Sequence, residues 1–456
     1  MSSDFLNAAE KMKEELGEAL CLAKWQQVSL HLTNGLTNSC YHPPLHEIDA
    51  NLLISNPSAL HNTPYKKERR KEMLEGKKCT ECSYCWNIEA TGNLSDRHYR
   101  SGEPWAAIHL NRIKEQKWDA DEVPSYVEVN FSNVCNLACS YCSPQFSSTW
   151  AAQAERFGSY PTSTPHNSLE HFQGRRKVIP NREHNPYLEA FWQWWPNLYL
   201  QLKHFRMTGG EPLMDKNTFR VFDYVLANHK TDLHLNVTSN FSVEPQIFDN
   251  YMNYVKQLCE GEKIEHFMQY VSVDSWGKQA EYIRPGLSFD RLKTNVERFL
   301  TEIPYRNSLT FIITMNNLVV PGIQELLNWI LELRDKHSTT YQRVWFDTPL
   351  LRSPSWQSLQ ILPTAYSWKL EQIKLWMEEK IIVEEQYRYC GFKDYEIQRM
   401  NRVIAMMKQQ NTSTQLKTDF YRFFNEHDRR HGFKFIDIFP EMTPFWDECK
   451  YYAEQI

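Results

Sequence analysis

The stretch Cys135-Asn-Leu-Ala-Cys139-Ser-Tyr-Cys142 carries most of the information about the fold and chemistry of this chain. Three cysteines spaced C-x3-C-x2-C on one short loop can bind three irons of a cubane [4Fe–4S] cluster. The fourth iron then has no protein ligand, and an iron with an open position can bind and act on a small molecule. Zinc also binds closely spaced thiolates, so a structural zinc site is the alternative.

The composition is that of a globular protein. The 456 residues include 41% apolar, 14% aromatic and 23% charged side chains. A formal net charge of −5 argues against a general nucleic-acid binder. No apolar run reaches the roughly 18–20 residues that span a bilayer, and the first residues lack a signal-peptide pattern. We therefore expect a cytoplasmic protein, in which clustered cysteines are metal ligands rather than disulfides.

From about residue 123, strand-like segments alternate with helical ones, which predicts parallel β/α units. The predicted strands are residues 126–131, 204–208, 233–238, 267–273, 309–314 and 343–347. The predicted helices between them include residues 218–228, 289–299 and 323–336. Six such units make an open barrel, whereas a closed one has eight.

Other segments have patterns of their own. The insertion 151–200 ends in the run Phe191-Trp-Gln-Trp-Trp195, whose helical spacing favours core packing over a base-stacking platform. A charged helix is predicted near residues 65–75, and we favour a solvent-exposed face over a phosphate contact for its basic side chains. These are Lys66, Lys67, Arg69, Arg70 and Lys71. Further helices are predicted near residues 364–385, 393–409 and 414–429.

Polar groups follow nearly every predicted strand of the barrel. The cysteine loop follows the first strand, and Gly209-Gly210-Glu211 follows the second. The loops after parallel strands meet at one end of a barrel, so these groups are expected to lie together. Glycines allow the backbone to approach a ligand closely, and Glu211 can accept a hydrogen bond from an ammonium group.

The third and fourth strands are followed by groups that suit other parts of a ligand. The hydroxyl of Ser239 and the amide of Asn240 are suited to the two hydroxyls of a ribose. Asp274 follows the fourth strand, and Arg284 in the loop beyond it can pair with a carboxylate in a two-pronged contact. Each group alone is typical of a turn or a surface ion pair, but together they outline a site.

The cysteine loop followed by Thr208-Gly-Gly-Glu-Pro212 resembles the radical S-adenosylmethionine (radical SAM) superfamily. The resemblance implies that Cys135, Cys139 and Cys142 hold a [4Fe–4S] cluster. It also implies that S-adenosylmethionine chelates the fourth iron through its amino and carboxylate groups.

The same resemblance implies roles for the residues after the later strands. Gly209, Gly210 and Glu211 would meet the methionine amine, and Ser239 and Asn240 would meet the ribose. Asp274 and Arg284 match less specific positions of the family.

A second group of cysteines precedes the barrel. Cys21, Gly35 and Cys40 are spaced C-x13-G-x4-C, and a C-x2-C-x2-C run follows at Cys79, Cys82 and Cys85. The spacing resembles the auxiliary-cluster modules called SPASM and twitch, and it implies one additional [4Fe–4S] cluster. We expect Cys21, Cys40, Cys82 and Cys85 to be the ligands, with Cys79 as the spare or alternate. Zinc is the alternative here too, and such modules more often follow the barrel.

Taken together, these patterns predict an α/β fold with three parts. A partial (β/α)6 TIM-type radical SAM barrel covers 123–350, with the insertion 151–200. A twitch-like auxiliary iron–sulfur module lies within 1–110, and 351–456 forms a helical C-terminal region. The insertion and the helical region are candidates for a lid. The whole resembles twitch domain-containing radical SAM proteins, some of them phage-encoded.

The resemblance implies reductive cleavage of S-adenosylmethionine to a 5′-deoxyadenosyl radical, which removes hydrogen from a substrate. A peptide or protein side chain is the first expectation for that substrate. A nucleotide or small metabolite is the alternative, and a non-catalytic iron–sulfur carrier or scaffold is a third possibility. An electron donor such as a flavodoxin or ferredoxin is the implied partner.

Overall fold

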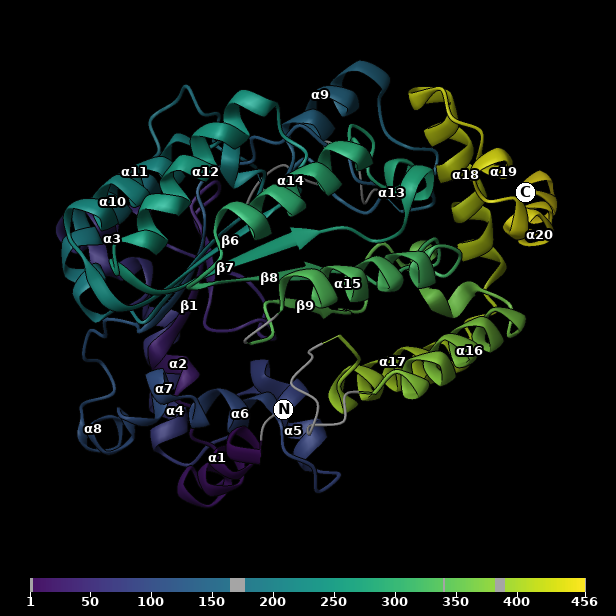
Figure 1. The fold of residues 1–456 in the computed structure, drawn as a ribbon. Helices are drawn as coiled ribbons and strands as arrows, with labels where there is room; N and C mark the ends of the chain where they lie inside the picture. The colour runs from purple at the N-terminus through teal and green to yellow at the C-terminus, as the bar shows by residue number, and fades with distance from the viewer. Residues whose placement is uncertain (1–2, 165–176, 339–340, 382–389, 456) are drawn as a thin grey trace. The chain divides into compact units, whose positions relative to one another are not determined.

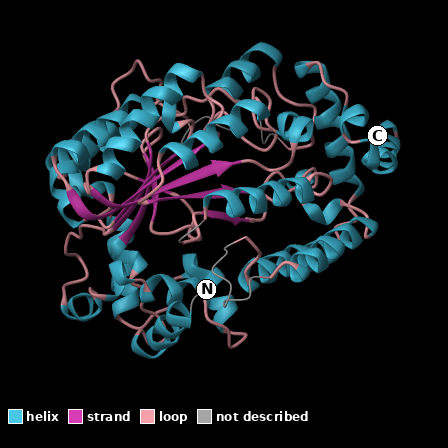
Figure 2. Ribbon diagram, viewed as in Figure 1, coloured by secondary structure: helices cyan, strands magenta, loops and turns pink. Residues whose placement is uncertain are grey.

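The strands of the computed structural model form one sheet (Figures 1 and 2). The structure describes residues 3–164, 177–338, 341–381 and 390–455. The strands are β1 (Gln27–His31), β2 (Leu36–Asn38), β3 (His46–Glu47), β4 (Tyr126–Asn130), β5 (His204–Thr208), β6 (Lys230–Ser239), β7 (Ile264–Ser272), β8 (Asn307–Ile312) and β9 (Val344–Asp347). Their order is β3-β2-β1-β4-β5-β6-β7-β8-β9, and helices join most of them, so the fold is mixed α/β.

The six strands predicted from residue 123 onward are present as β4 to β9, in chain order. β4 pairs with β5 in parallel, and Asn130 lies opposite Thr208 where both strands end. β7 pairs with β8, and β8 with β9, also in parallel. The six predicted strands are therefore confirmed, and so is the parallel direction of these three strand pairs.

The N-terminal residues add three strands to one edge of this sheet. β1 pairs in parallel with β4, from Gln27 opposite Tyr126 to His31 opposite Asn130. β2 pairs antiparallel with β1, and β3 antiparallel with β2. The pairing of β1 with a strand about a hundred residues away leaves no local pattern in the sequence.

Packing divides the chain into two compact units. The N-terminal unit consists of Met1–Ser132, Lys177–Gly209 and Lys230–Asn236, and the C-terminal unit of Asn133–Arg176, Gly210–His229 and Val237–Ile456. The cysteines from Cys21 to Cys85 thus belong to the first unit, and those from Cys135 to Cys142 to the second. These boundaries differ from the ranges predicted from the sequence, because residues 177–209 pack with the N-terminal segment.

Six helices lie between or beside the strands of the C-terminal unit along the chain. They are α9 (Ser148–Phe157), α11 (Lys216–Ala227), α12 (Pro245–Glu260), α13 (Gly277–Ile283), α14 (Phe289–Glu302) and α15 (Ile323–His337). In α14, Phe289, Val296 and Phe299 lie on the buried stripe, and the side chain of Ser288 caps the helix. α12 packs against β7 and α14, and α15 packs against β9 (Figure 1).

The C-terminal region is helical, as predicted. Its helices are α16 (Ala365–Glu379), α17 (Asp394–Lys408), α18 (Thr414–His431), α19 (Phe435–Ile438) and α20 (Thr443–Glu454). α16 packs against α17, and α18 against α20 (Figure 1). The hydroxyl of Tyr282 in α13 donates to Asp428 in α18 at 2.8 Å, which ties this region to the loop after β7.

Short helices and one long helix make up the rest of the N-terminal unit. They are α1 (Ser3–Glu15), α2 (Ala23–Gln26), α3 (Ala50–Ser55), α4 (Pro64–Leu74), α5 (Ser83–Glu89), α6 (Asp96–Gly102), α7 (Pro104–Ala107), α8 (Leu110–Glu115) and α10 (Pro186–Gln201). A core of apolar side chains joins several of them, among them Leu16, Leu22, Trp25, Trp105 and Ile113.

Two basic side chains of helix α4 are buried, which contradicts one prediction from the sequence. The sequence favours an exposed basic face, but Lys66 and Arg70 are only 1% and 0% exposed. Lys66 donates to Thr37 Oγ1 at 3.0 Å, and Arg70 donates to Asn62 Oδ1 at 2.9 Å. The exposed-face prediction is therefore wrong for these two side chains, because polar partners outside the helix compensate their burial.

The aromatic run of the predicted insertion lies in α10 and packs in the core, as predicted. Phe191 contacts Phe131 at a ring-centroid distance of 5.2 Å, and Trp195 contacts Phe205 at 4.9 Å. Residues 165–176 of the insertion lie outside the described part of the chain. None of the helices that the structure describes has both the length and the apolar character that crossing a membrane requires.

Candidate functional site

The cysteine loop connects β4 to α9, and the start of α9 holds it. The hydroxyl of Thr149 donates to the Cys135 carbonyl at 2.6 Å, and the indole N–H of Trp150 donates to the Cys139 carbonyl at 2.8 Å. A second anchor comes from the segment after α13. Ala138 N donates to Pro285 O at 2.9 Å, and the Ser140 N–H donates to the Ile283 carbonyl at 2.8 Å.

The three thiols of this loop lie close enough to influence one another. Burial raises the pKa of Cys135, and the negative charges of Cys139 and Glu211 raise it further. Burial likewise raises the pKa of Cys142 to about 12, with Cys139 contributing. Without a metal these thiols hold their protons at neutral pH, so metal binding at this loop would release protons.

The two glycines after β5 permit close packing against the neighbouring backbone. Gly209 has a φ of +114°, and a Cβ on it would lie 2.1 Å from Asn130 Oδ1. A Cβ on Gly210 would lie 2.3 Å from the carbonyl oxygen of Val134, at the start of the cysteine loop. Both positions thus lie too close to neighbouring atoms of the protein for a residue with a Cβ, which is one reason for glycine at each.

Glu211 links two loops through its carboxylate. Its Oε1 accepts the Leu213 N–H at 3.1 Å, and its Oε2 accepts the Asn240 N–H at 2.7 Å. Its own N–H donates to Val134 O at 2.6 Å. Burial raises the pKa of Glu211 to about 7, although hydrogen bonds from Asn240, Ser239 and Leu213 oppose the rise. The predicted contact with a methionine amine stays a prediction.

The side chains of Ser239 and Asn240 also make bonds within the protein. Ser239 Oγ accepts the Phe241 N–H at 2.9 Å. Asn240 Nδ2 donates to Asn136 Oδ1 at 2.8 Å, and its Oδ1 accepts the Ser242 N–H at 2.9 Å. Asn240 therefore ties the loop after β6 to the cysteine loop, and the predicted ribose contact of both residues stays a prediction.

Arg284 joins Asp274 to the cysteine loop. Its Nε donates to Asp274 Oδ2 at 2.9 Å and its Nη2 to Asp274 Oδ1 at 3.2 Å. Its Nη1 donates to Cys139 Sγ at 3.5 Å. The two-pronged carboxylate contact expected of Arg284 is thus present, with a protein carboxylate as its partner. Although burial opposes its charge, Asp274 and Tyr141 hold the pKa of Arg284 well above its usual value.

Tyr141 completes this network, and the sequence analysis missed its role. Its hydroxyl donates to Asp274 Oδ2 at 2.7 Å and accepts from Arg284 Nη2 at 2.5 Å. The only local signal of this role in the sequence is that Tyr141 lies between two of the motif cysteines, Cys139 and Cys142. The arrangement puts a buried, locked cation against one sulfur of the loop.

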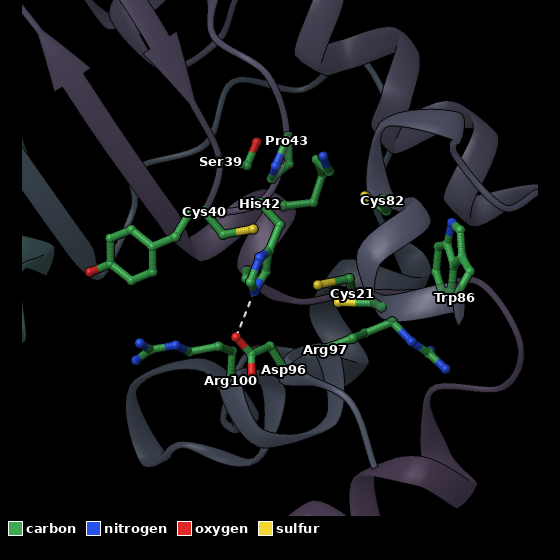
Figure 3. Close-up of a pocket in the computed structure, with 14 residues that line it drawn as sticks. Cys21, Ser39, Cys40, His42, Pro43, Cys82, Trp86, Asp96, Arg97 and Arg100 are labelled. Atoms are coloured by element: carbon green, nitrogen blue, oxygen red, sulfur yellow. Dashed lines mark hydrogen bonds and ion pairs between the residues drawn. The ribbon is translucent and has the colours of Figure 1, made fainter. Parts of the chain in front are cut away.

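The second cysteine group surrounds a cavity in the N-terminal unit (Figure 3). The structure places four of the five cysteines around it, namely Cys21, Cys40, Cys82 and Cys85. Cys79 does not line the cavity, and its thiol donates to the Arg69 carbonyl at 3.3 Å. The four cysteines that line the cavity are the same four that the sequence predicts as ligands, and Cys79 is the predicted spare.

Three separate segments bring these thiols together. Cys21 precedes α2, Cys40 follows β2, Cys82 stands at the N-terminus of α5, and Cys85 lies within α5. The glycine of the spacing pattern forms the turn between β1 and β2. Gly35 has a φ of +68°, and a Cβ there would enter the ring of Tyr187 in α10.

Positive charge lies beside these thiols. Burial raises the pKa of Cys82 to about 11 and those of Cys40 and Cys85 to about 12, and Lys24 lowers the pKa of Cys82 and Cys40. Lys24 is buried in an ion pair with Glu81. A buried ammonium group next to thiols favours their deprotonated, metal-binding form.

The donor set fits an iron–sulfur cluster. Within the described part of the chain, no three His, Cys, Asp or Glu side chains stand in positions to hold a single metal ion. A cluster distributes its ligands over several irons, so its cysteines need not converge on one point. Four thiols around one cavity, with cationic neighbours, have the chemistry that such a cluster requires.

Comparison with known proteins adds little to this description. No family model and no curated protein matches the chain. Three crystal structures of SuiB from Streptococcus suis match at 14% sequence identity. They are SuiB bound to S-adenosylmethionine (TM-score 0.34), SuiB bound to the precursor peptide SuiA (0.32) and SuiB itself (0.34). The matches cover 77%, 78% and 77% of this chain and 68% of each SuiB chain. Structural similarity at these TM-scores and this sequence identity assigns neither a fold nor an activity to the chain.

Proposed function

We propose that this chain is a radical SAM enzyme with a partial (β/α)6 TIM-type barrel. The observation that carries the proposal is the cysteine loop at the end of β4, anchored from two sides and packed against the Gly209-Gly210-Glu211 turn. Cys135, Cys139 and Cys142 would hold a [4Fe–4S] cluster. When bound, that cluster would supply the electron for reductive cleavage of S-adenosylmethionine, and so for removal of a hydrogen atom from the substrate.

The residues of the chain hold and orient this site. Glu211 and Asn240 fix the loops after β5 and β6 against the cysteine loop through buried hydrogen bonds. This leaves the backbone carbonyls of Gly209 and Gly210 to meet the methionine amine. Arg284 places its charge at Cys139, where it stabilises a thiolate.

We further propose that Cys21, Cys40, Cys82 and Cys85 hold one auxiliary [4Fe–4S] cluster in a twitch-like module within residues 1–110. The cavity that these four thiols share supports this assignment. An electron donor such as a flavodoxin or ferredoxin would serve the enzyme. The cytoplasmic setting expected from the sequence belongs to the same proposal, because it keeps thiols reduced.

The proposed substrate is a peptide or protein side chain. This choice follows from the family resemblance, in which twitch-type modules often accompany peptide modification. The nucleotide alternative drew weak support from the basic residues of α4. Two of these, Lys66 and Arg70, are buried, and Lys67 is paired with Asp121 at 2.6 Å. The helix therefore offers less free positive charge to phosphates than its sequence indicates.

The test is anaerobic reconstitution with iron and sulfide, reduction with dithionite, and measurement of 5′-deoxyadenosine. We expect product from the unmodified chain and none from Cys135→Ala, Cys139→Ala or Cys142→Ala. Cys259→Ala and Cys449→Ala are matched controls, because both thiols are buried in the C-terminal unit away from the loop, and these variants should keep the activity.

Two outcomes separate the alternatives. A cluster-loaded protein that makes no 5′-deoxyadenosine would favour the carrier or scaffold. For an active enzyme, deuterium transfer into 5′-deoxyadenosine from labelled peptide pools, but not from labelled nucleotides, would identify the substrate class.

A further inference from the structure

His42 lies on the wall of the cavity that holds the second cysteine group. Figure 3 shows its ring near Cys40, with one ring nitrogen directed at Asp96. The side chain is only 9% exposed, and its Nδ1 is buried without a hydrogen-bond partner. A buried imidazole nitrogen without a partner is costly unless a ligand satisfies it.

The other ring nitrogen is held in place. His42 Nε2 and Asp96 Oδ2 are 2.6 Å apart, and Asp96 opens α6. The ring also stacks on Tyr84 at a centroid distance of 3.8 Å. Because a carboxylate accepts the Nε2 proton, the neutral ring presents its lone pair at Nδ1. A histidine that donates one nitrogen to a carboxylate and keeps the other free is the usual form of a metal-ligating histidine.

Other histidines of the same unit have different surroundings. His46 bonds to Thr63 Oγ1 at 3.0 Å through Nε2, and His61 Nε2 lies 2.7 Å from the carbonyl oxygen of Trp25. Neither lines the cavity. His42 thus differs from both, because it lines the cavity that the four thiols share and its Nδ1 has no hydrogen-bond partner.

We propose that His42 is an iron ligand of the auxiliary centre, bound through Nδ1 and oriented by Asp96. The proposal rests on the auxiliary cluster proposed above. Cys40 and His42 are two residues apart and both line the cavity, so we assign them to the same iron. This assignment revises the ligand set proposed above at one position: His42 takes the place of Cys40, and Cys40 binds that iron only when His42 is absent. Cys21, Cys82 and Cys85 hold the other three irons.

The experiment uses the full chain with Cys135, Cys139 and Cys142 changed to alanine, so that the auxiliary site alone is loaded. Protein labelled with ¹⁵N-histidine is reconstituted, reduced and examined by pulsed electron paramagnetic resonance. We expect a hyperfine coupling of ligand strength from one histidine nitrogen. His42→Ala should abolish this coupling and keep the iron and sulfide content, because Cys40 replaces the imidazole.

Further variants make the assignment specific. Cys40→Ala should keep both the cluster and the coupling, whereas the double variant Cys40→Ala/His42→Ala should lose the cluster, as Cys21→Ala should. Asp96→Asn should weaken metal affinity, by roughly 10–100-fold. His46→Ala is the matched control and should change nothing. If His42→Ala fails to fold, His42→Gln provides the second variant.

The possible failures can be told apart. A loaded cluster without histidine coupling, or with the same coupling in His42→Ala, would overturn the role of His42 and leave the auxiliary cluster standing. A protein that takes up no iron in this background would overturn the auxiliary cluster and this inference together. Neither result bears on 5′-deoxyadenosine formation at Cys135, Cys139 and Cys142.

Discussion

The two cysteine groups reach similar donor sets by different means. Cys135, Cys139 and Cys142 lie on one loop, and backbone bonds from α9 and from residues 283–285 fix that loop. Cys21, Cys40, Cys82 and Cys85 come from separate segments that meet at a cavity. The first site therefore depends on the conformation of one short loop, and the second on the tertiary packing of the N-terminal unit.

The positively charged side chains near the sulfurs also differ between the two sites. In the loop, a guanidinium locked by Asp274 donates to one sulfur. In the cavity, the positive charge comes from Lys24, which is paired with Glu81 and lies near several thiols. A single directed hydrogen bond distinguishes one ligand from the others, whereas Lys24 lowers the pKa of Cys21, Cys40 and Cys82 together.

The largest expected effect separates the two sites. Cys135→Ala should lower the iron and sulfide content by that of one cluster and abolish 5′-deoxyadenosine formation. The reason is that the loop has no fourth cysteine to replace the missing ligand. Cys82→Ala should remove the other cluster and leave cleavage of S-adenosylmethionine measurable. Iron and sulfide analysis of both variants tests their independence, and joint loss in either variant would show that the two sites are coupled.

A large effect is also expected from breaking the locked cation. Arg284→Met leaves Asp274 buried without its partner, and we expect a loss of about 3–5 kcal/mol in the free energy of unfolding. The midpoint potential of the loop's cluster should fall, because a positive charge beside Cys139 stabilises the electron-rich reduced form. Redox titration followed by electron paramagnetic resonance measures this shift.

The control for this variant is Arg284→Met combined with Asp274→Asn. The neutral amide removes the buried charge, so most of the lost stability should return while the lowered potential remains. A potential equal to that of the unmodified chain would show that Arg284 has no influence on the cluster.

A smaller effect is expected at the turn after β5. A Cβ on Gly210 would meet the backbone of Val134 and displace the start of the cysteine loop. Gly210→Ala should cost about 1–3 kcal/mol in the free energy of unfolding and reduce iron at the loop only. Gly92→Ala tests backbone strain without a clash, since nothing lies within 4 Å of its Cβ position. Denaturant titration and iron analysis compare the two.

The smallest effect is expected at the fifth cysteine of the N-terminal unit. Cys79→Ala removes the thiol that donates to Arg69 O, and it should cost about 1 kcal/mol in the free energy of unfolding. Iron and sulfide content should stay unchanged. A lost auxiliary cluster in this variant would contradict the division of the five cysteines into four ligands and a spare.

Local patterns made much of the molecule predictable. The strands β4 to β9 and the helices α14 and α15 follow from runs of apolar residues at periods of two and 3.6. The C-x3-C-x2-C loop is contiguous, so its spacing alone indicates its chemistry. The turn at Gly209 and Gly210 was also found, although its close contact is to the protein itself.

Long-range pairing accounts for what was missed. Three kinds of contact join residues far apart in the chain: the pairing of β1 with β4, the bonds from Lys66 to Thr37 and from Arg70 to the Lys24 carbonyl, and the bond between Tyr141 and Asp274. His42 has no motif of its own, because its partner Asp96 is 54 positions away. Such pairs leave no periodicity in a single sequence.

The turn at Gly35 has a consequence for shortened versions of the protein. The ring of Tyr187 in α10 fills the space beside Gly35, Asn185 Nδ2 donates to Leu32 O at 2.8 Å, and Ile179 N donates to Thr33 O at 2.8 Å. The second half of the insertion thus supports the β1–β2 hairpin, which is followed by Cys40. A shortened protein without this segment would lose these contacts, and the hairpin would be destabilised.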